Sequence, residues 1–181
     1  MQTHEAPPLT VDSRARRIRL VLLDVDGVLS DGTVILDASG AESKGFNIKD
    51  GAAIVWALGA GLTVGLLSSR QSGATAQRAA QLGIPILAQG IRGKRAEYER
   101  IRAELGLAAA EVAYMGDDLV DLPVMQCVGL SGAPSDAAPE ILDVAHWVSV
   151  REGGRGAVRE FLEVILKSQG LWSGVIQEFS A

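Results

Sequence analysis

The sequence predicts one α/β domain of three layers, in which helices cover both faces of a parallel β-sheet. Its 181 residues are enough for a single domain with a substantial core. The composition is 48% hydrophobic but only 4% aromatic, which indicates an aliphatic core. Short apolar segments typical of buried strands alternate along the chain with segments of helical periodicity. This alternation is characteristic of a parallel sheet with right-handed crossovers.

Short apolar segments account for the strands of the predicted sheet. In the first of them, Val21, Leu22 and Leu23 follow one another without a polar residue, as expected of a strand covered on both faces. We expect strands at Ile18–Asp24, Leu62–Ser68, Pro85–Ala88, Val112–Met115, Val128–Leu130 and Trp147–Val150.

Helices are expected between these strands and after the last one. Gly59 and Gly61 end the first helix before the strand that follows it. In the final helix, Val158, Phe161 and Ile165 recur at helical spacing, so one face should pack on the sheet. We expect helices at Gly51–Leu58, Gly73–Leu82, Lys94–Leu105, Leu119–Met125, Ala137–Asp143 and Ala157–Ser168.

The chain divides into a single domain and two tails. The domain should span residues 18–170, after an N-terminal tail of residues 1–17. Within it, GTVIL and KGFNI flank the polar sequence DASGAE, which predicts a β-hairpin flap at about residues 32–47. The C-terminal tail, residues 171–181, has apolar residues at helical spacing. This apolar face either packs on the chain's own core or docks on another subunit.

Charge and composition exclude several classes of partner. The net charge is −5 and no long basic block occurs, which argues against nucleic acid and anionic membranes. Residues 51–69 lack charge, but three glycines interrupt them, so a buried helix and strand are expected instead of a membrane span. The single cysteine, Cys127, can form no intrachain disulfide. With no apolar N-terminal run of the signal-peptide kind, we expect a cytoplasmic protein.

Two carboxylates follow the first strand in the sequence DVDG. Asp24 and Asp26 are two residues apart, so in an extended chain they project to the same side. Neighbouring carboxylates repel each other, which predicts that a metal ion, a lysine or both lie beside them. The alternative interpretation is an ordinary turn, in which Asp and Gly are common.

Polar residues follow three further strands. Ser68 ends the second strand, Lys94 lies after the third, and Asp117, Asp118 and Asp121 follow the fourth. Each has an ordinary explanation on its own, as a helix cap, a solvated first-turn residue or a loop carboxylate. In a parallel sheet, however, all four strand ends meet at one edge. Their coincidence therefore predicts one site.

The residue types at this edge suit phosphoryl transfer. Mg²⁺ prefers a few carboxylates together with water and substrate phosphate oxygens. A hydroxyl and an ammonium group can hold the remaining phosphate oxygens, and one carboxylate can attack phosphorus. A second carboxylate can protonate the leaving oxygen and then activate water.

The motifs resemble those of a known enzyme superfamily. DVDGVLSDG, the Ser68 and Lys94 signatures and GDDLVDLPVM look like the haloacid dehalogenase superfamily of phosphatases. More narrowly, together with GFNIKDG and GGRGAVREFLEVIL, they are similar to the 3-deoxy-D-manno-octulosonate 8-phosphate (KDO 8-phosphate) phosphatases. The similarity extends from Ile18 to Gly170. It implies a Rossmann-like, haloacid dehalogenase-type sheet with a hairpin flap and no cap domain.

The resemblance assigns a role to each matching residue. Asp24 would be the nucleophile and a magnesium ligand, and Asp26 would be the general acid and base, with its backbone carbonyl on the metal. Ser68 would hydrogen-bond the phosphoryl group, and Lys94 would neutralise its charge. Asp117 would be the third protein ligand of Mg²⁺.

Two further aspartates and two departures complete this comparison. Asp121 would orient Lys94 or a metal-bound water, and Asp118 is a similar candidate beside the metal. The family usually has Thr-Gly-Arg where this chain has Ser68-Ser69-Arg70. Ser68 keeps the hydroxyl of the threonine, but Ser69 in place of the glycine can reshape the loop. An acidic residue usually precedes the lysine, where this chain has Gly93, which puts a local ion pair in doubt.

The short spacing between motifs leaves no room for a cap domain, so a lone subunit would leave the site open to water. We therefore expect other subunits to close the site through the hairpin and the C-terminal segment, and the resemblance implies a homotetramer. Arg70 and Arg155 are candidates for binding the sugar-acid carboxylate, since guanidinium matches carboxylate geometry. A surface ion pair is the alternative role for each arginine.

Three functions stay open at this point. The first is magnesium-dependent hydrolysis of KDO 8-phosphate in lipopolysaccharide sugar biosynthesis. The second is the same reaction on a nine-carbon sugar acid 9-phosphate, such as a sialic acid or its deaminated analogue. The third is a non-enzymatic phospho-aspartate signalling or scaffold protein. The motifs do not separate the first two, because the catalytic residues would be identical.

Overall fold

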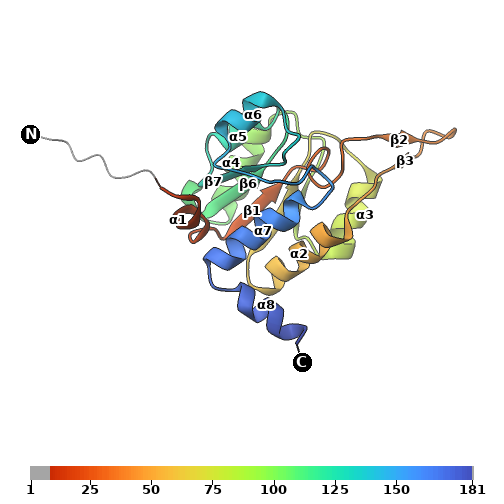
Figure 1. The fold of residues 1–181 in the computed structure, drawn as a ribbon. Helices are drawn as coiled ribbons and strands as arrows, with labels where there is room; N and C mark the ends of the chain where they lie inside the picture. The colour runs from red at the N-terminus through yellow and green to blue at the C-terminus, as the bar shows by residue number, and fades with distance from the viewer. Residues whose placement is uncertain (1–8, 181) are drawn as a thin grey trace, which may run out of the picture.

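The computed structural model describes residues 9–180, and a six-stranded parallel sheet forms its centre (Figure 1). The strand order is β5-β4-β1-β6-β7-β8, and every neighbouring pair is parallel. This confirms the predicted α/β fold. The strands are β1 Leu20–Leu23, β4 Thr63–Leu67, β5 Ile86–Ala88, β6 Val112–Met115, β7 Leu130–Ala133 and β8 Trp147–Val148.

Helices cover both faces of the sheet because the side chains of each strand alternate between two cores. On β1, Val21 and Leu23 belong to the core under α1, α2, α3 and α7, whereas Leu20 and Leu22 belong to the core under α4, α5 and α6. The helices are α1 Val11–Ala15, α2 Ile48–Gly59, α3 Gly73–Leu82, α4 Lys94–Glu104, α5 Leu122–Met125, α6 Pro139–Val144, α7 Ala157–Ser168 and α8 Trp172–Glu178, with a 3₁₀ turn at Ala109–Glu111.

The order in which the chain adds strands to the sheet reverses at β1. The chain runs outward from β1 through β4 to β5, then crosses back to β6 and continues outward to β8. The loops after β1 and β6 therefore leave toward opposite sides and open a crevice at the carboxyl ends of these strands. The edge at which the polar residues were expected is the edge of this crevice.

Several element boundaries differ from those expected. Helix α2 begins at Ile48, three residues early, because the Asn47 side chain accepts a hydrogen bond from the Lys49 backbone at 2.8 Å and caps the helix. Strand β7 begins at Leu130, later than expected, and continues through Gly132. A Cβ on Gly132 would lie 2.7 Å from the Phe161 ring, so this strand needs the glycine that resembles a turn signal in the sequence.

The segments expected to be tails contain helices. At the N-terminal end, α1 buries Ala15, and the Arg14 guanidinium donates to the Gly129 carbonyl oxygen at 2.6 Å. At the C-terminal end, α8 places the Trp172 ring 5.9 Å from Trp56 on α2, edge to face. Of the two interpretations of the apolar C-terminal face, packing on the chain's own core accounts for this contact.

A hairpin leaves the body of the protein between β1 and α2 (Figure 1). Its strands are β2 Ile35–Leu36 and β3 Glu42–Ser43, paired antiparallel as expected. The Asp37 carboxylate accepts hydrogen bonds from the backbone of Ser39 and Ala41 and so holds the turn. Within residues 9–180, no helix is long and apolar enough to cross a membrane.

Candidate active site

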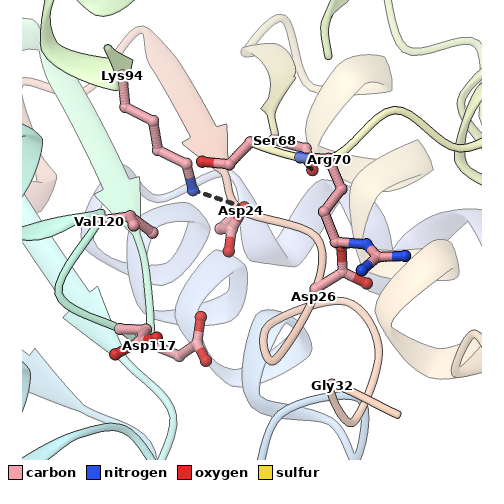
Figure 2. Close-up of a pocket in the computed structure, with 10 residues that line it drawn as sticks. Asp24, Asp26, Gly32, Ser68, Arg70, Lys94, Asp117 and Val120 are labelled. Carbon is pink, nitrogen blue, oxygen red and sulfur yellow. Dashed lines mark hydrogen bonds and ion pairs between the residues drawn. The ribbon is translucent and has the colours of Figure 1, made fainter. Parts of the chain in front are cut away.

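Asp24 comes directly after β1 and faces a cavity of about 290 Å³ at the carboxyl edge of the sheet (Figure 2). Its backbone N–H donates to the Met115 carbonyl oxygen on β6 at 3.0 Å, so the strand ladder fixes its position. Its side chain is only 8% exposed, and one oxygen lies 2.7 Å from Lys94 Nζ. Burial, followed by the charge of Asp121, raises the pKa of Asp24 to about 6.

Lys94 is the first residue of α4, and its ammonium group lies between two carboxylates. Its Nζ is 2.7 Å from Asp24 and 2.6 Å from Asp121 Oδ1. Burial lowers its pKa, but the two carboxylates outweigh this effect and raise the pKa above its usual value. Lys94 is therefore a permanent cation. Helix α4 has no side-chain cap at Gly93, the position where the family usually has an acidic residue.

Both oxygens of Asp121 have partners, and the residue is fully buried. Oδ1 accepts from Lys94 and from the Tyr114 hydroxyl, the latter at 2.6 Å. Oδ2 accepts from the backbone N–H groups of Asp117 and Asp118 at 3.0 and 3.3 Å. Asp121 thus joins Lys94 to the loop after β6. Asp118 takes part through its backbone, and its carboxylate accepts from the backbone of Leu119.

Asp117 lies opposite Lys94 across the cavity (Figure 2). Its Oδ1 is buried and has no hydrogen-bond partner among the described residues. Burial, and then the charges of Asp24 and Asp121, raise its pKa to about 8. Carboxylate oxygens of Asp24, Asp117 and Asp121 lie within 4.8 Å of one another. Since the oxygens of Asp121 already have donors, Asp24 and Asp117 are the side chains that fit a divalent cation here.

The loop after β4 supplies hydroxyl groups to the same cavity. Ser68 follows β4 and is 3% exposed, and its Oγ accepts from the Arg70 backbone at 3.2 Å. The backbone N–H of Ser68 donates to the Ala88 carbonyl oxygen, which ties the loop to β5. Ser69 and the Arg70 side chain also line the cavity. The structure thus brings residues from β1, β4, β6 and α4 together as expected.

Asp26 lines the cavity but faces other partners than Asp24 does. Its carboxylate is paired with Lys44 Nζ, and its Oδ2 lies 3.7 Å from Arg70 (Figure 2). Lys44 also lies 3.6 Å from Glu42, and Glu42 in turn binds Arg70 at 2.7 Å. Asp24 and Asp26 thus both line the cavity, but Asp24 is paired with Lys94 and Asp26 with Lys44.

Sequence reasoning missed Lys44 and Glu42. Glu42 is on β3 and Lys44 follows it by two residues, so both side chains leave the same face of an extended segment. That alternation of opposite charges in GAESKG was the available signal. The role of these charges could not be predicted because Lys44 meets Asp26 only where the chain returns from the hairpin, which is a long-range contact.

Arg155 lies outside this cavity. Its side chain is 65% exposed, and its guanidinium lies 3.7 Å from the Asp31 carboxylate. It borders a separate surface cavity of about 690 Å³ together with Arg151 and Arg159. Of the two arginines expected to bind the substrate carboxylate, the structure therefore brings only Arg70 to the site.

The fold and the site together define a phosphatase of the haloacid dehalogenase superfamily: an aspartate directly after β1, a serine after β4, a buried lysine at the start of α4 and an aspartate cluster after β6. No family model matches the chain. A KDO 8-phosphate phosphatase from Escherichia coli K12 is 43% identical over 165 residues, which cover 90% of this chain and 88% of the relative. The chain belongs to the KDO 8-phosphate phosphatase family.

Solved structures agree with this assignment. The KDO 8-phosphate phosphatase of Yersinia pestis has a TM-score of 0.89 at 43% identity and covers 91% of this chain and 89% of its own. The enzyme from Moraxella catarrhalis, solved in complex with magnesium, phosphate and KDO, has a TM-score of 0.92 at 32% identity, with coverage of 93% and 97%.

Proposed function

We propose that this chain hydrolyses KDO 8-phosphate to KDO and phosphate in lipopolysaccharide sugar biosynthesis, with Mg²⁺ as its cofactor. The observation that carries the proposal is the pairing of Asp24 with buried Lys94 in one cavity, opposite an Asp117 oxygen that has no hydrogen-bond partner within residues 9–180. The relatives support the choice of substrate, since a 43% identical protein is a KDO 8-phosphate phosphatase and a 32% identical structure holds KDO, phosphate and magnesium.

Magnesium would be held by the carboxylates of Asp24 and Asp117 and by the backbone carbonyl of Asp26. The raised pKa values of Asp24 and Asp117, about 6 and about 8, support this choice, because a cation would relieve the repulsion and burial that raise them. When bound, Mg²⁺ supplies positive charge to the phosphoryl oxygens during transfer.

The chain's own residues account for both half-reactions. The Asp24 carboxylate attacks phosphorus and forms an aspartyl-phosphate, while Asp26, which exchanges its ion pair with Lys44 for a proton when substrate binds, gives that proton to the departing sugar oxygen. Asp26, now a carboxylate, removes a proton from water as the water attacks the aspartyl-phosphate, which regenerates both residues and releases phosphate. Lys94 and the Ser68 hydroxyl hold phosphoryl oxygens in both steps. Arg70 is the residue we assign to the substrate carboxylate, in preference to Arg155.

A homotetramer is part of the proposal. The cavity is small and open, so a neighbouring subunit would be needed to exclude water and select the sugar. The hairpin supports this role, because Ile35 and Leu36 are 56% and 63% exposed at its outer strand. A cytoplasmic location is also proposed, in keeping with the single cysteine, Cys127.

The test is phosphate release by the purified protein with Mg²⁺. We expect kcat/KM for KDO 8-phosphate to exceed that for sialic acid 9-phosphate and for common sugar phosphates by about a hundredfold or more. Asp24→Asn is the matched blank, because it keeps the size of the side chain and removes the nucleophile.

Each alternative predicts a different result in this assay. A preference for the nine-carbon substrate would keep the mechanism and replace the substrate. Folded protein without activity on any phosphate ester would contradict the enzymatic proposal and favour a signalling or scaffold role.

A further inference from the structure

Tyr114 contributes a buried hydroxyl to the charge cluster of the site. It lies on β6, paired between Leu22 of β1 and Ser131 of β7, and its side chain is fully buried. Its hydroxyl donates to Asp121 Oδ1 at 2.6 Å and lies 3.3 Å from Lys94 Nζ, which donates to it. Burial and the charge of Asp121 raise the pKa of Tyr114 well above its usual value, so the hydroxyl stays a donor.

The contacts of Asp121 explain what this hydroxyl does. Asp121 Oδ1 has two donors, the neutral Tyr114 hydroxyl and the Lys94 ammonium. Without the hydroxyl, Lys94 alone would satisfy that oxygen, and the ion pair would draw the ammonium toward Asp121. Lys94 would then leave Asp24, which lies 2.7 Å away in this arrangement. A neutral donor on Asp121 thus leaves the ammonium shared between two carboxylates.

We propose that Tyr114 is a positioning residue that holds Lys94 between Asp121 and Asp24 and so presents the ammonium to the transferred phosphoryl group. The inference rests on the proposed role of Lys94 in phosphoryl transfer. Tyr114 does not reach the cavity itself, so it acts on the reaction through Lys94.

A second tyrosine provides a matched control. Tyr98 on α4 is also fully buried and belongs to the same core as Tyr114. Its hydroxyl has no hydrogen-bond partner among residues 9–180. Tyr114→Phe and Tyr98→Phe therefore remove the same atom from the same core, once with the contact to Lys94 and once without it.

We expect Tyr114→Phe to lower kcat about tenfold with KM changed by less than about twofold, because the contact serves the transition state more than substrate binding. Tyr98→Phe should keep kcat within about twofold of the wild type. The comparison is made with KDO 8-phosphate and with p-nitrophenyl phosphate. The second substrate reports the chemistry without the sugar acid, so an error in the proposed substrate is recognised separately.

A double-mutant cycle shows whether Tyr114 acts through Lys94. In a Lys94→Met background, the further change Tyr114→Phe should leave the residual kcat unchanged within about twofold. An equal loss in both backgrounds would overturn the proposal, as would equal kcat values for Tyr114→Phe and Tyr98→Phe. A Tyr114→Phe protein that fails to fold, beside a folded Tyr98→Phe, would assign the hydroxyl to stability and overturn the proposal as well.

Discussion

Gly27 illustrates how closely the residues of the site are packed. Its φ of +89° is in the left-handed region, and a Cβ there would lie 2.0 Å from Asp117 Oδ2. Gly61 has a similar φ of +92°, but its Cβ would meet nothing within 4 Å. The two glycines therefore share the backbone requirement and differ only in the contact with the aspartate.

We expect Gly27→Ala to lower kcat/KM by about a hundredfold, because the added methyl group would displace the Asp117 carboxylate. Gly61→Ala should cost about 1–2 kcal/mol of stability from backbone strain and keep the activity of the folded protein. Steady-state kinetics and thermal melts of both variants check this. Similar activity for the two would show that the loop accommodates the methyl group.

The raised pKa values of Asp24 and Asp117 predict a pH-dependent response to magnesium. Both have an ordinary value of 3.8 in the unfolded chain and values of about 6 and about 8 in the fold. The folded state without a cation therefore binds more protons, so its stability decreases as pH rises from about 4 to about 8. Mg²⁺ replaces those protons, and its effect should grow over the same pH range.

We expect Mg²⁺ to raise the Tm more at pH 8 than at pH 5.5, as measured by calorimetry with and without the ion. At the lower pH, protons on both carboxylates compete with the metal. Asp117→Asn should remove most of the stabilisation at both pH values. An equal Tm shift at the two pH values in the wild type would contradict the assignment of these ligands.

Several of the predicted residues that the structure brings to this edge share one property: they lie within two residues of the end of a strand or begin a helix. Asp24, Ser68, Lys94 and Asp117 meet because parallel strands end together, which a pattern of strands and helices already implies. Lys44 was missed because its position depends on how the hairpin folds back, which periodicity does not describe. The same holds for the contacts of each arginine, since long, exposed side chains have no preferred partner in the sequence.

At the scale of elements, Asp50 connects α2 to α7. It is 1% exposed, and its carboxylate accepts from the backbone N–H groups of Gly156 and Arg159 at 3.2 and 2.7 Å. A side chain from one helix thus caps the start of another. The loop before α7 in turn supports the site, because a Cβ on Gly153 would lie 1.8 Å from the Gly27 carbonyl oxygen.

We expect Asp50→Asn to lower the free energy of unfolding by roughly 1–2 kcal/mol, since an amide presents only one acceptor oxygen to two buried N–H groups. Asp143→Asn is the control, because Asp143 is exposed and should change stability by less than about 0.5 kcal/mol. Urea denaturation followed by circular dichroism measures both. Equal stability of the two variants would contradict the capping role.

The element boundaries that sequence reasoning misplaced have a common cause. Helix α2 begins early because of the Asn47 cap, and β7 extends past Leu130 through Gly132, which packs against the Phe161 ring. Both depend on contacts between elements, whereas the existence and order of the elements follow from local periodicity. The expected tails likewise gained helices through packing on the core.

At the scale of the whole molecule, the hairpin is the surface that we expect to contact other subunits. Ile35→Asp combined with Leu36→Asp should convert the proposed tetramer into smaller species in analytical ultracentrifugation. We expect kcat/KM for KDO 8-phosphate to decrease about tenfold or more, with a smaller decrease for p-nitrophenyl phosphate. The reason is that the variant loses the neighbouring subunit that encloses the sugar but keeps all of the catalytic residues.

Leu105→Asp provides the control for that experiment. Leu105 is also apolar and 44% exposed, but it lies beside Arg19 and Gly61 at the opposite edge of the sheet. It should leave the assembly and both activities unchanged. A fully active monomer, in the wild type or in the hairpin variant, would contradict the proposed closure by neighbouring subunits.

The strand order also determines when the site can form as the chain leaves the ribosome. Leu20 of β1 pairs with Thr63 on one side and with Val112 on the other, so the central strand remains half-paired until β6 has been synthesised. Such non-local pairings fold slowly. A nascent chain that ends before Asp121 would have Asp24, Lys94 and Tyr114 but not the carboxylate that binds both Lys94 and Tyr114. Translation therefore delivers Asp24 first and Asp121 last among these residues, so the site can assemble only after Asp121 has been synthesised.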